Sequence, residues 1–146
     1  MFEKSRMKTP AISIPLRLAL LFSVVLLAGA GFLLADEWDK SQEEKWNKAF
    51  METVAEGDRL FHGPELAGNT VQCAMCHPNA TNTHPETYPK FQKQLGKVAT
   101  MREMINWCIR NPLQGTELKY DDPKMIAIEA YILYERRNVP LAPGKH

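Results

Sequence analysis

The stretch that decides the fold is Cys73-Ala74-Met75-Cys76-His77. A C-x-x-C-H pentapeptide is the attachment signature of a c-type haem. Its two-residue spacing places both thiols on one side of a helical turn, where each can form a thioether with a haem vinyl group. The following residue, His77, then points its imidazole at the iron as the proximal ligand. The pattern therefore predicts one covalently bound haem c, with Cys73, Cys76 and His77 as its attachment residues.

Other uses of a C-x-x-C pair fit this chain less well. A thioredoxin-type redox pair needs a βαβ context, which the sequence does not show. A zinc site needs further Cys or His residues at ligand spacing, and only His84 lies nearby. A disulfide between Cys73 and Cys76 would close a strained short loop. Because the chain has only three cysteines, a disulfide scaffold does not fit either.

The chain around this motif is long enough for one small domain, with 146 residues. Charged residues make up 24% and hydrophobic residues 45%, a balance typical of a globular protein rather than a disordered one. The net charge is +1, and no run of Lys and Arg interleaved with aromatic residues follows residue 35. The composition therefore argues against a nucleic-acid partner.

An uncharged apolar stretch fills residues 18–35 and is just long enough to cross a bilayer, which takes roughly 17–25 residues. Basic residues precede it and Asp36-Glu37 follow it, so the positive-inside rule leaves residues 1–17 in the cytoplasm. We expect a transmembrane anchor in a bacterial inner membrane, with the haem domain facing the periplasm. The alternative is a signal peptide cleaved near residues 28–30, which exports the remainder to the same compartment.

The exported part is predicted to consist of helices separated by long loops. Apolar side chains at Trp46, Phe50 and Val54 predict an amphipathic helix over residues 38–61. A second helix is expected from about residue 90 to residue 110, because the following Asn-Pro pair stops a helix.

The last helix is predicted to begin near Asp122-Pro123, a capping residue followed by a proline of the first turn, and to end near residue 138. No strand-like alternation persists along the chain. We therefore expect an all-α fold around one haem, in which residues 36–54 form a spacer and residues 55–146 form the haem domain. Since so small a domain buries little apolar surface, a large cofactor would complete its core.

Three sulfur-bearing side chains compete for the sixth position of the iron. Met101, Met104 and Cys108 are spaced three and four residues apart, so they share one face of a helix. Cys108 is also the cysteine left over once haem takes the other two. Cys108 is the candidate distal ligand, with Met104 and Met101 as alternatives, although each is also a plausible core residue. A vacant site or a histidine ligand completes the possibilities.

Several polar residues near this face are candidates for contacts with an anion. Arg102 and Arg110 flank it, and one of them could pair with a haem propionate or an anionic substrate. His84 lies on a polar loop and is expected either in solvent or against a propionate.

Beyond the haem motif, the chain resembles a class I cytochrome c domain. In that family the first and last helices cross through a contact between a glycine and aromatic side chains. Gly57, Phe61 and Tyr131 occupy the matching positions. The resemblance implies a helical fold around the haem and a role in electron transfer.

The chain further resembles the sulfur-oxidation cytochrome SoxA and the thiosulfate dehydrogenases. This resemblance lies in residues 107–110, 128–131 and 139–141. In SoxA-like proteins the position of Cys108 holds a thiolate ligand. In the thiosulfate dehydrogenases a methionine ligand stands where this chain has Leu113, which cannot bind iron.

Two functions follow from this resemblance. The first is a membrane-anchored monohaem cytochrome that transfers electrons between an exported dehydrogenase and the respiratory chain. The second is the haem subunit of a SoxA-like or thiosulfate dehydrogenase-like sulfur-compound oxidoreductase. Because catalytic members generally bring a second haem and this chain has one C-x-x-C-H motif, we expect an electron-transfer protein rather than a stand-alone enzyme. A gas-binding sensor would require a vacant sixth position.

Overall fold

The computed structural model describes residues 39–145, and the chain divides into two units, residues 1–43 and 44–146. The expected cytoplasmic segment and membrane anchor, residues 1–17 and 18–35, lie outside the described residues. Within residues 39–145, no helix combines the length and the apolar character that crossing a membrane requires. Of the first unit, the structure describes the start of helix α2 (Lys40–His62), where the Asp39 carboxylate accepts hydrogen bonds from Ser41.

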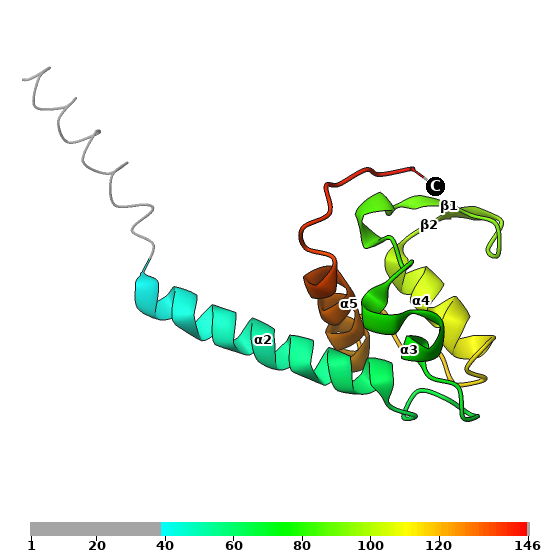
Figure 1. The fold of residues 1–146 in the computed structure, drawn as a ribbon, viewed down its shortest axis with the longest axis horizontal. Coiled ribbons are helices and arrows are strands. Elements are labelled where there is room, and N and C mark those ends of the chain that lie inside the picture. Colours follow the sequence, from blue (N-terminus) through cyan, green and yellow to red (C-terminus); the bar gives the residue numbers. More distant parts are fainter. Residues whose placement is uncertain (1–38, 146) are drawn as a thin grey trace, which may run out of the picture. The chain divides into compact units, whose positions relative to one another are not determined.

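The second unit is built on a crossing of two helices, the later part of α2 and the final helix α5 (Pro123–Glu135) (Figure 1). Gly57 stands at the crossing point, where an added Cβ would lie only 1.9 Å from the carbonyl oxygen of Ala127. The rings of Phe61 and Tyr131 pack beside it, with 5.0 Å between their centroids. The predicted contact between a glycine and two aromatic side chains is therefore confirmed.

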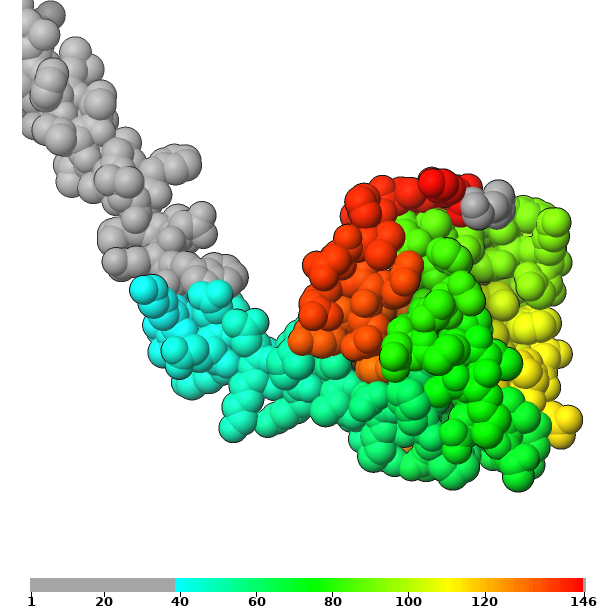
Figure 2. All heavy atoms as spheres, in the orientation of Figure 1, coloured from blue at the N-terminus to red at the C-terminus, as the bar shows by residue number. Residues whose placement is uncertain are grey.

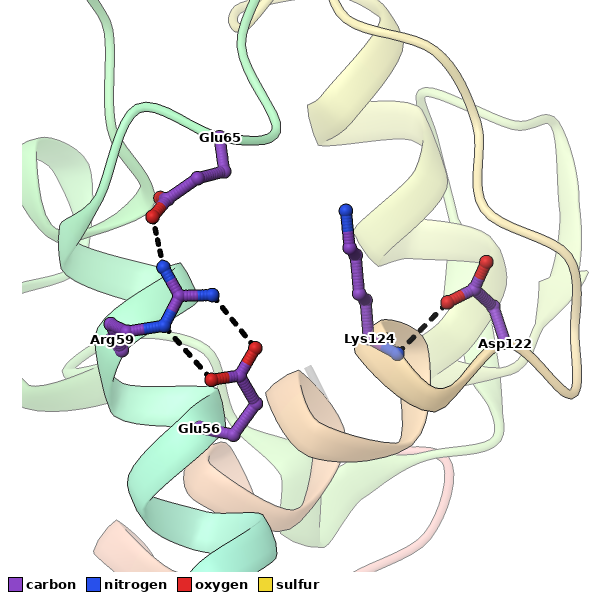
Figure 3. Close-up of polar contacts among 5 residues, drawn as sticks. All are labelled: Glu56, Arg59, Glu65, Asp122 and Lys124. Carbon is purple, nitrogen blue, oxygen red and sulfur yellow. Dashed lines mark hydrogen bonds and ion pairs between the residues drawn. The ribbon is translucent and has the colours of Figure 1, made fainter.

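The start of α5 also agrees with the sequence prediction. Asp122 is the N-cap, and its carboxylate accepts a hydrogen bond of 2.9 Å from the backbone nitrogen of Lys124 (Figure 3). On the facing end of α2, Arg59 pairs with Glu56 and Glu65 (Figure 3). These three side chains are exposed, so their ion pairs contribute little to stability.

The core lies between these helices and the short helix α4 (Met101–Arg110). Its most deeply buried side chains come from all three helices and are Leu60, Ile109, Met125 and Ile128. Between α2 and α4 the chain forms the single-turn helix α3 (Cys73–Cys76) and two 3-10 turns, η1 (Pro78–Ala80) and η2 (Pro85–Thr87).

Residues 90–99 form a β-hairpin, so the prediction of a helix from residue 90 is wrong. Strand β1 (Lys90–Gln92) pairs antiparallel with β2 (Lys97–Ala99). The turn between them contains Gly96 in the left-handed conformation, with φ at +68°. A glycine adopts this conformation without steric cost and thereby favours the turn over a continuous helix. The fold is mostly helical with one hairpin, rather than all-α.

Helix α4 begins only at Met101 because Thr100 and Glu103 form a capping box. The Thr100 hydroxyl accepts a hydrogen bond from the backbone of Glu103, and the Glu103 carboxylate accepts one of 2.7 Å from the backbone of Thr100. Lys97 of the hairpin donates to the same carboxylate. The box thus links the hairpin to the helix.

Replacing Glu103 with glutamine is expected to lower the urea midpoint of unfolding at pH 7 but not near pH 2. The hydrogen bonds from Lys97 and Thr100 lower the pKa of Glu103 from 4.5 to about 2. Because its pKa is lower in the folded state, the carboxylate stabilises the fold above pH 4.5, and this contribution is lost as the pH falls through about 2. Glu52→Gln, at an exposed site on α2, is the matched control. An equal midpoint difference at both pH values would contradict the prediction.

The C-terminal tail closes the domain by binding the loop around η2. The backbone nitrogens of Ala142 and Gly144 donate hydrogen bonds of 2.8 Å to the carbonyl oxygens of Glu86 and Thr87. The tail consequently lies along the surface of this loop (Figure 2). This contact holds the segment that follows the C-x-x-C-H motif in place.

Candidate functional site

A cavity of about 430 Å³ opens between α3, α4, α5 and the hairpin. Its volume lies within the range of pockets that enclose a small molecule or cofactor. The helical walls are largely apolar and include Met101, Ile105, Trp107, Ile109, Ile128 and Ile132. No Asp or Glu lines the cavity among the described residues. The site is therefore shaped for a large apolar group.

The two cysteines of the motif both line this cavity from α3. Cys73 is partly buried and Cys76 is exposed. Burial raises the pKa of the Cys73 thiol to about 11, and the nearby Cys108 adds to the rise. The one-turn helix thus presents both cysteines to the same cavity, as the spacing of the motif predicts.

His77 follows directly and also lines the cavity. Its backbone nitrogen donates a hydrogen bond of 3.0 Å to the Cys73 carbonyl oxygen, which closes the turn. Its Nδ1 lies 3.0 Å from the carbonyl oxygen of Thr81. Because a carbonyl only accepts hydrogen bonds, Nδ1 carries the proton in this contact, and the lone pair of Nε2 remains free for a metal. The histidine is thus held as an iron ligand requires.

The three sulfur candidates on α4 face the same cavity. Met101, Met104 and Cys108 all line it, which confirms that they share one helix face. Burial raises the pKa of Cys108 to about 11, with a smaller contribution from Cys76. Leu113 lines the cavity as well and is 4% exposed. The site therefore offers three sulfurs for a sixth ligand.

The arginines expected to bind an anion are engaged elsewhere. Arg102 pairs with Glu129 and donates a hydrogen bond of 2.6 Å to the Tyr120 carbonyl oxygen. Arg110 pairs with Glu117, and neither arginine lines the cavity. Both pairs tie α4 to neighbouring parts of the chain, so these two residues have a structural role here.

His84 likewise lies outside the cavity lining. Its Nδ1 is 3.0 Å from a carboxylate oxygen of Glu86, and half of its side chain is exposed. The expectation of an exposed histidine is confirmed, and the expected alternative, a contact with a propionate, has no support in this placement.

The hairpin supplies cavity residues that the sequence reasoning missed. Lys90 and Gln92 of β1 line the cavity, together with Tyr88 and Gln94. They escaped notice because residues 90–100 were expected to continue a helix. The one local signal is Gly96, which favours a turn, because residues 90–92 and 97–99 are too short to show the alternation of a strand.

Taken together, the residues of the cavity fit a covalently attached haem. Two thiols lie at one end, a histidine presents a free ring nitrogen, and the helices provide apolar walls. This combination of a helical fold and a thioether attachment site defines a cytochrome c domain.

Comparison with known proteins leads to the same class. Residues 56–141 match the family described as SoxA/TsdA, cytochrome c domain, and the chain belongs to this family. The family carries haem c, so one iron-containing haem is bound covalently through Cys73 and Cys76.

Two curated proteins illustrate the relationship. Over 85 residues the chain is 29% identical to a thiosulfate dehydrogenase of Psychrobacter arcticus, an alignment that covers 53% of this chain and 26% of the relative. Over 110 residues it is 27% identical to the L-cysteine S-thiosulfotransferase subunit SoxA of Rhodovulum sulfidophilum, with 73% and 38% covered. The chain thus spans less than two fifths of the length of either relative.

Proposed function

We propose that this protein is a membrane-anchored periplasmic cytochrome that carries electrons from a sulfur-compound dehydrogenase to the respiratory chain. The observation that carries the proposal is one haem attachment motif whose three residues, Cys73, Cys76 and His77, all line the same cavity. When bound, haem c accepts and donates one electron at a time by cycling its iron between the ferric and ferrous states. Joining two thiosulfate molecules through a new S–S bond releases two electrons. Because one haem takes up only one electron, a single haem suits an electron carrier better than an enzyme that oxidises sulfur compounds by itself.

The chain's own residues support a carrier. Apolar side chains of α4 and α5 line much of the cavity, and the His77–Thr81 hydrogen bond fixes the imidazole. No carboxylate among the described lining residues is available for acid–base chemistry in the cavity. A tether formed by residues 18–35 would raise the effective concentration of the haem domain near membrane partners.

A second candidate function rests on Cys108. Its thiol faces the cavity together with the haem-binding cysteines, where a sulfur substrate could reach it. The names of the two relatives, a thiosulfate dehydrogenase and a thiosulfotransferase subunit, point to sulfur compounds as well. In this role the chain would be the haem subunit of a larger sulfur-compound oxidoreductase, with a partner that takes the second electron.

Rapid mixing of the full-length oxidised protein in membrane vesicles with thiosulfate distinguishes the two functions. For a carrier we expect no haem reduction by thiosulfate alone and complete reduction once a catalytic amount of a thiosulfate-oxidising dehydrogenase is added. Haem absorbance should remain in the membrane fraction after washing with carbonate. Reduction by thiosulfate alone, abolished in Cys108→Ala, would contradict the carrier and support the second function. Dithionite provides the control that every sample is reducible.

A further inference from the structure

Part of the lining of the haem cavity is polar and comes from the hairpin region. The cavity is lined by Lys90, Gln92 and Gln94 of the hairpin region and by Tyr88 just before it, in addition to the apolar side chains of the helices. Lys90 is the only charged residue among the described residues that line the cavity. The wall therefore combines one positive charge with neutral hydrogen-bonding groups.

These side chains form a connected group. Lys90 and Gln92 stand two residues apart on β1 and so project from the same face of the hairpin. Gln92 Nε2 donates a hydrogen bond of 2.6 Å to the Tyr88 hydroxyl oxygen. Lys90 Nζ lies 4.8 Å from the centre of the Tyr88 ring. Because the hydroxyl oxygen already accepts a hydrogen bond, its proton is available for a further acceptor in the cavity.

Among the described residues, neither Lys90 nor the exposed Lys93 of the hairpin turn has a carboxylate partner, but only Lys90 lines the cavity. Lys97, Arg102 and Arg110 each pair with a glutamate. Within residues 39–145, no carboxylate lies within ion-pair distance of Lys90, whose side chain is partly withdrawn from solvent. A partly buried cation on the wall of a cavity is stabilised by an anion that binds beside it there.

The position of this wall matches the chemistry of the cofactor. Haem carries its two vinyl groups on one edge and its two propionates on the opposite edge. The thioether bonds place the vinyl edge at α3, and Cys108 near the end of α4 is close enough to Cys73 to influence the ionisation of its thiol. The hairpin adjoins the other end of α4, where Ala99 precedes Met101, and it lies apart from α3 in Figure 1. A haem attached at α3 would therefore extend its propionate edge away from α3, and the hairpin residues that line the cavity would be available to hold it.

We propose that Lys90, assisted by Gln92 and Tyr88, forms an oxyanion-binding site in the cavity and that its ligand is a haem propionate. A dissolved oxyanion such as thiosulfate offers the same chemistry, so the experiment needs an arm for each source. This site requires only the bound haem and does not depend on which protein donates the electrons.

The first arm measures the reduction potential of the full-length protein as a function of pH by spectroelectrochemistry. In Lys90→Gln, the pH at which the propionate ionises should rise by about one unit, because an adjacent cation lowers a carboxyl pKa by roughly 1–3 units. Lys90→Arg should restore the wild-type curve. Lys93→Gln removes the same charge from an exposed position of the hairpin turn and should leave the curve unchanged. Pyridine haemochrome analysis of each variant confirms equal haem content.

The second arm titrates the oxidised protein with thiosulfate, and with sulfate as a non-reducing analogue, while the haem spectrum is followed. For a propionate ligand, Lys90→Gln should bind these anions no differently from wild type. An affinity at least tenfold lower in Lys90→Gln than in Lys93→Gln, with an unchanged pH profile, would assign the same site to a dissolved oxyanion. If Lys90→Gln and Lys93→Gln behave alike in both arms, Lys90 binds no oxyanion and the proposal is overturned.

Discussion

Substituting Gly57 with alanine is expected to lower the free energy of unfolding by about 2 kcal/mol or more, even though alanine is the better helix former. Two effects oppose each other at this position. Alanine gains about 1 kcal/mol over glycine in a helix interior. Its Cβ, however, would lie 1.9 Å from the Ala127 carbonyl oxygen and 2.7 Å from Tyr131 Cβ. Overpacking costs typically 1–3 kcal/mol and more where backbone atoms must move, so the clash wins.

The structural reason for this large effect is that the clashing atom belongs to the backbone of α5. A side chain could rotate away, but the Ala127 carbonyl moves only if the whole helix shifts. Such a shift separates Phe61 from Tyr131, and Phe61 also lines the haem cavity. We therefore expect the substitution to disturb the haem environment as well as the global stability.

Urea unfolding followed by both far-ultraviolet circular dichroism and the haem absorbance measures this effect. Ala49→Gly, at an exposed site on the same helix, is the control for the intrinsic difference between the two residues. It should cost about 1 kcal/mol. If Gly57→Ala were instead more stable than wild type by a similar amount, the two helices would not cross at Gly57.

Features that are specified by a few neighbouring residues could be predicted from the sequence. The motif at residues 73–77 identified the haem attachment, and Asp122 with its following proline located the start of α5. The Gly57 crossing was readable through the family resemblance. In each case a few adjacent residues, or one recurring contact, are sufficient to specify the geometry.

Features that depend on residues far apart in the sequence could not be predicted from the sequence alone. The strands of the hairpin have three residues each, which is too short for an alternating pattern to differ from a helical one. Arg102 is paired with Glu129, which lies 27 residues away in the sequence. Since only the tertiary fold brings them together, a sequence-based assignment of Arg102 to an anion had no means of detecting its partner. The same error about the hairpin concealed Lys90.

Replacing Cys108 with alanine is expected to change the electron paramagnetic resonance and absorption spectra of the oxidised haem. Cys108 lines the cavity on the same face of α4 as Met101 and Met104, and the resemblance to SoxA implies a thiolate ligand at this position. A thiolate holds the reduction potential low, whereas a methionine raises it. The potential of Cys108→Ala should therefore be higher than that of the wild type, and its reduced form should bind carbon monoxide if the sixth position becomes vacant.

Two further variants distinguish Cys108 from the other possible sulfur ligands. One removes the Met104 sulfur, and the other adds a methionine at position 113. Met104→Leu conserves volume and should leave the spectra unchanged if Cys108 is the ligand. In Cys108→Ala/Leu113→Met, a thioether enters the cavity at a buried position that already lines it, again with little change in volume. We expect this double variant to show the near-infrared magnetic circular dichroism of methionine ligation and to lose carbon monoxide binding. Spectra of Cys108→Ala identical to wild type, together with altered spectra of Met104→Leu, would assign the ligand to Met104 and refute the thiolate, because only the side chain bound to iron can change the ligand field in this way.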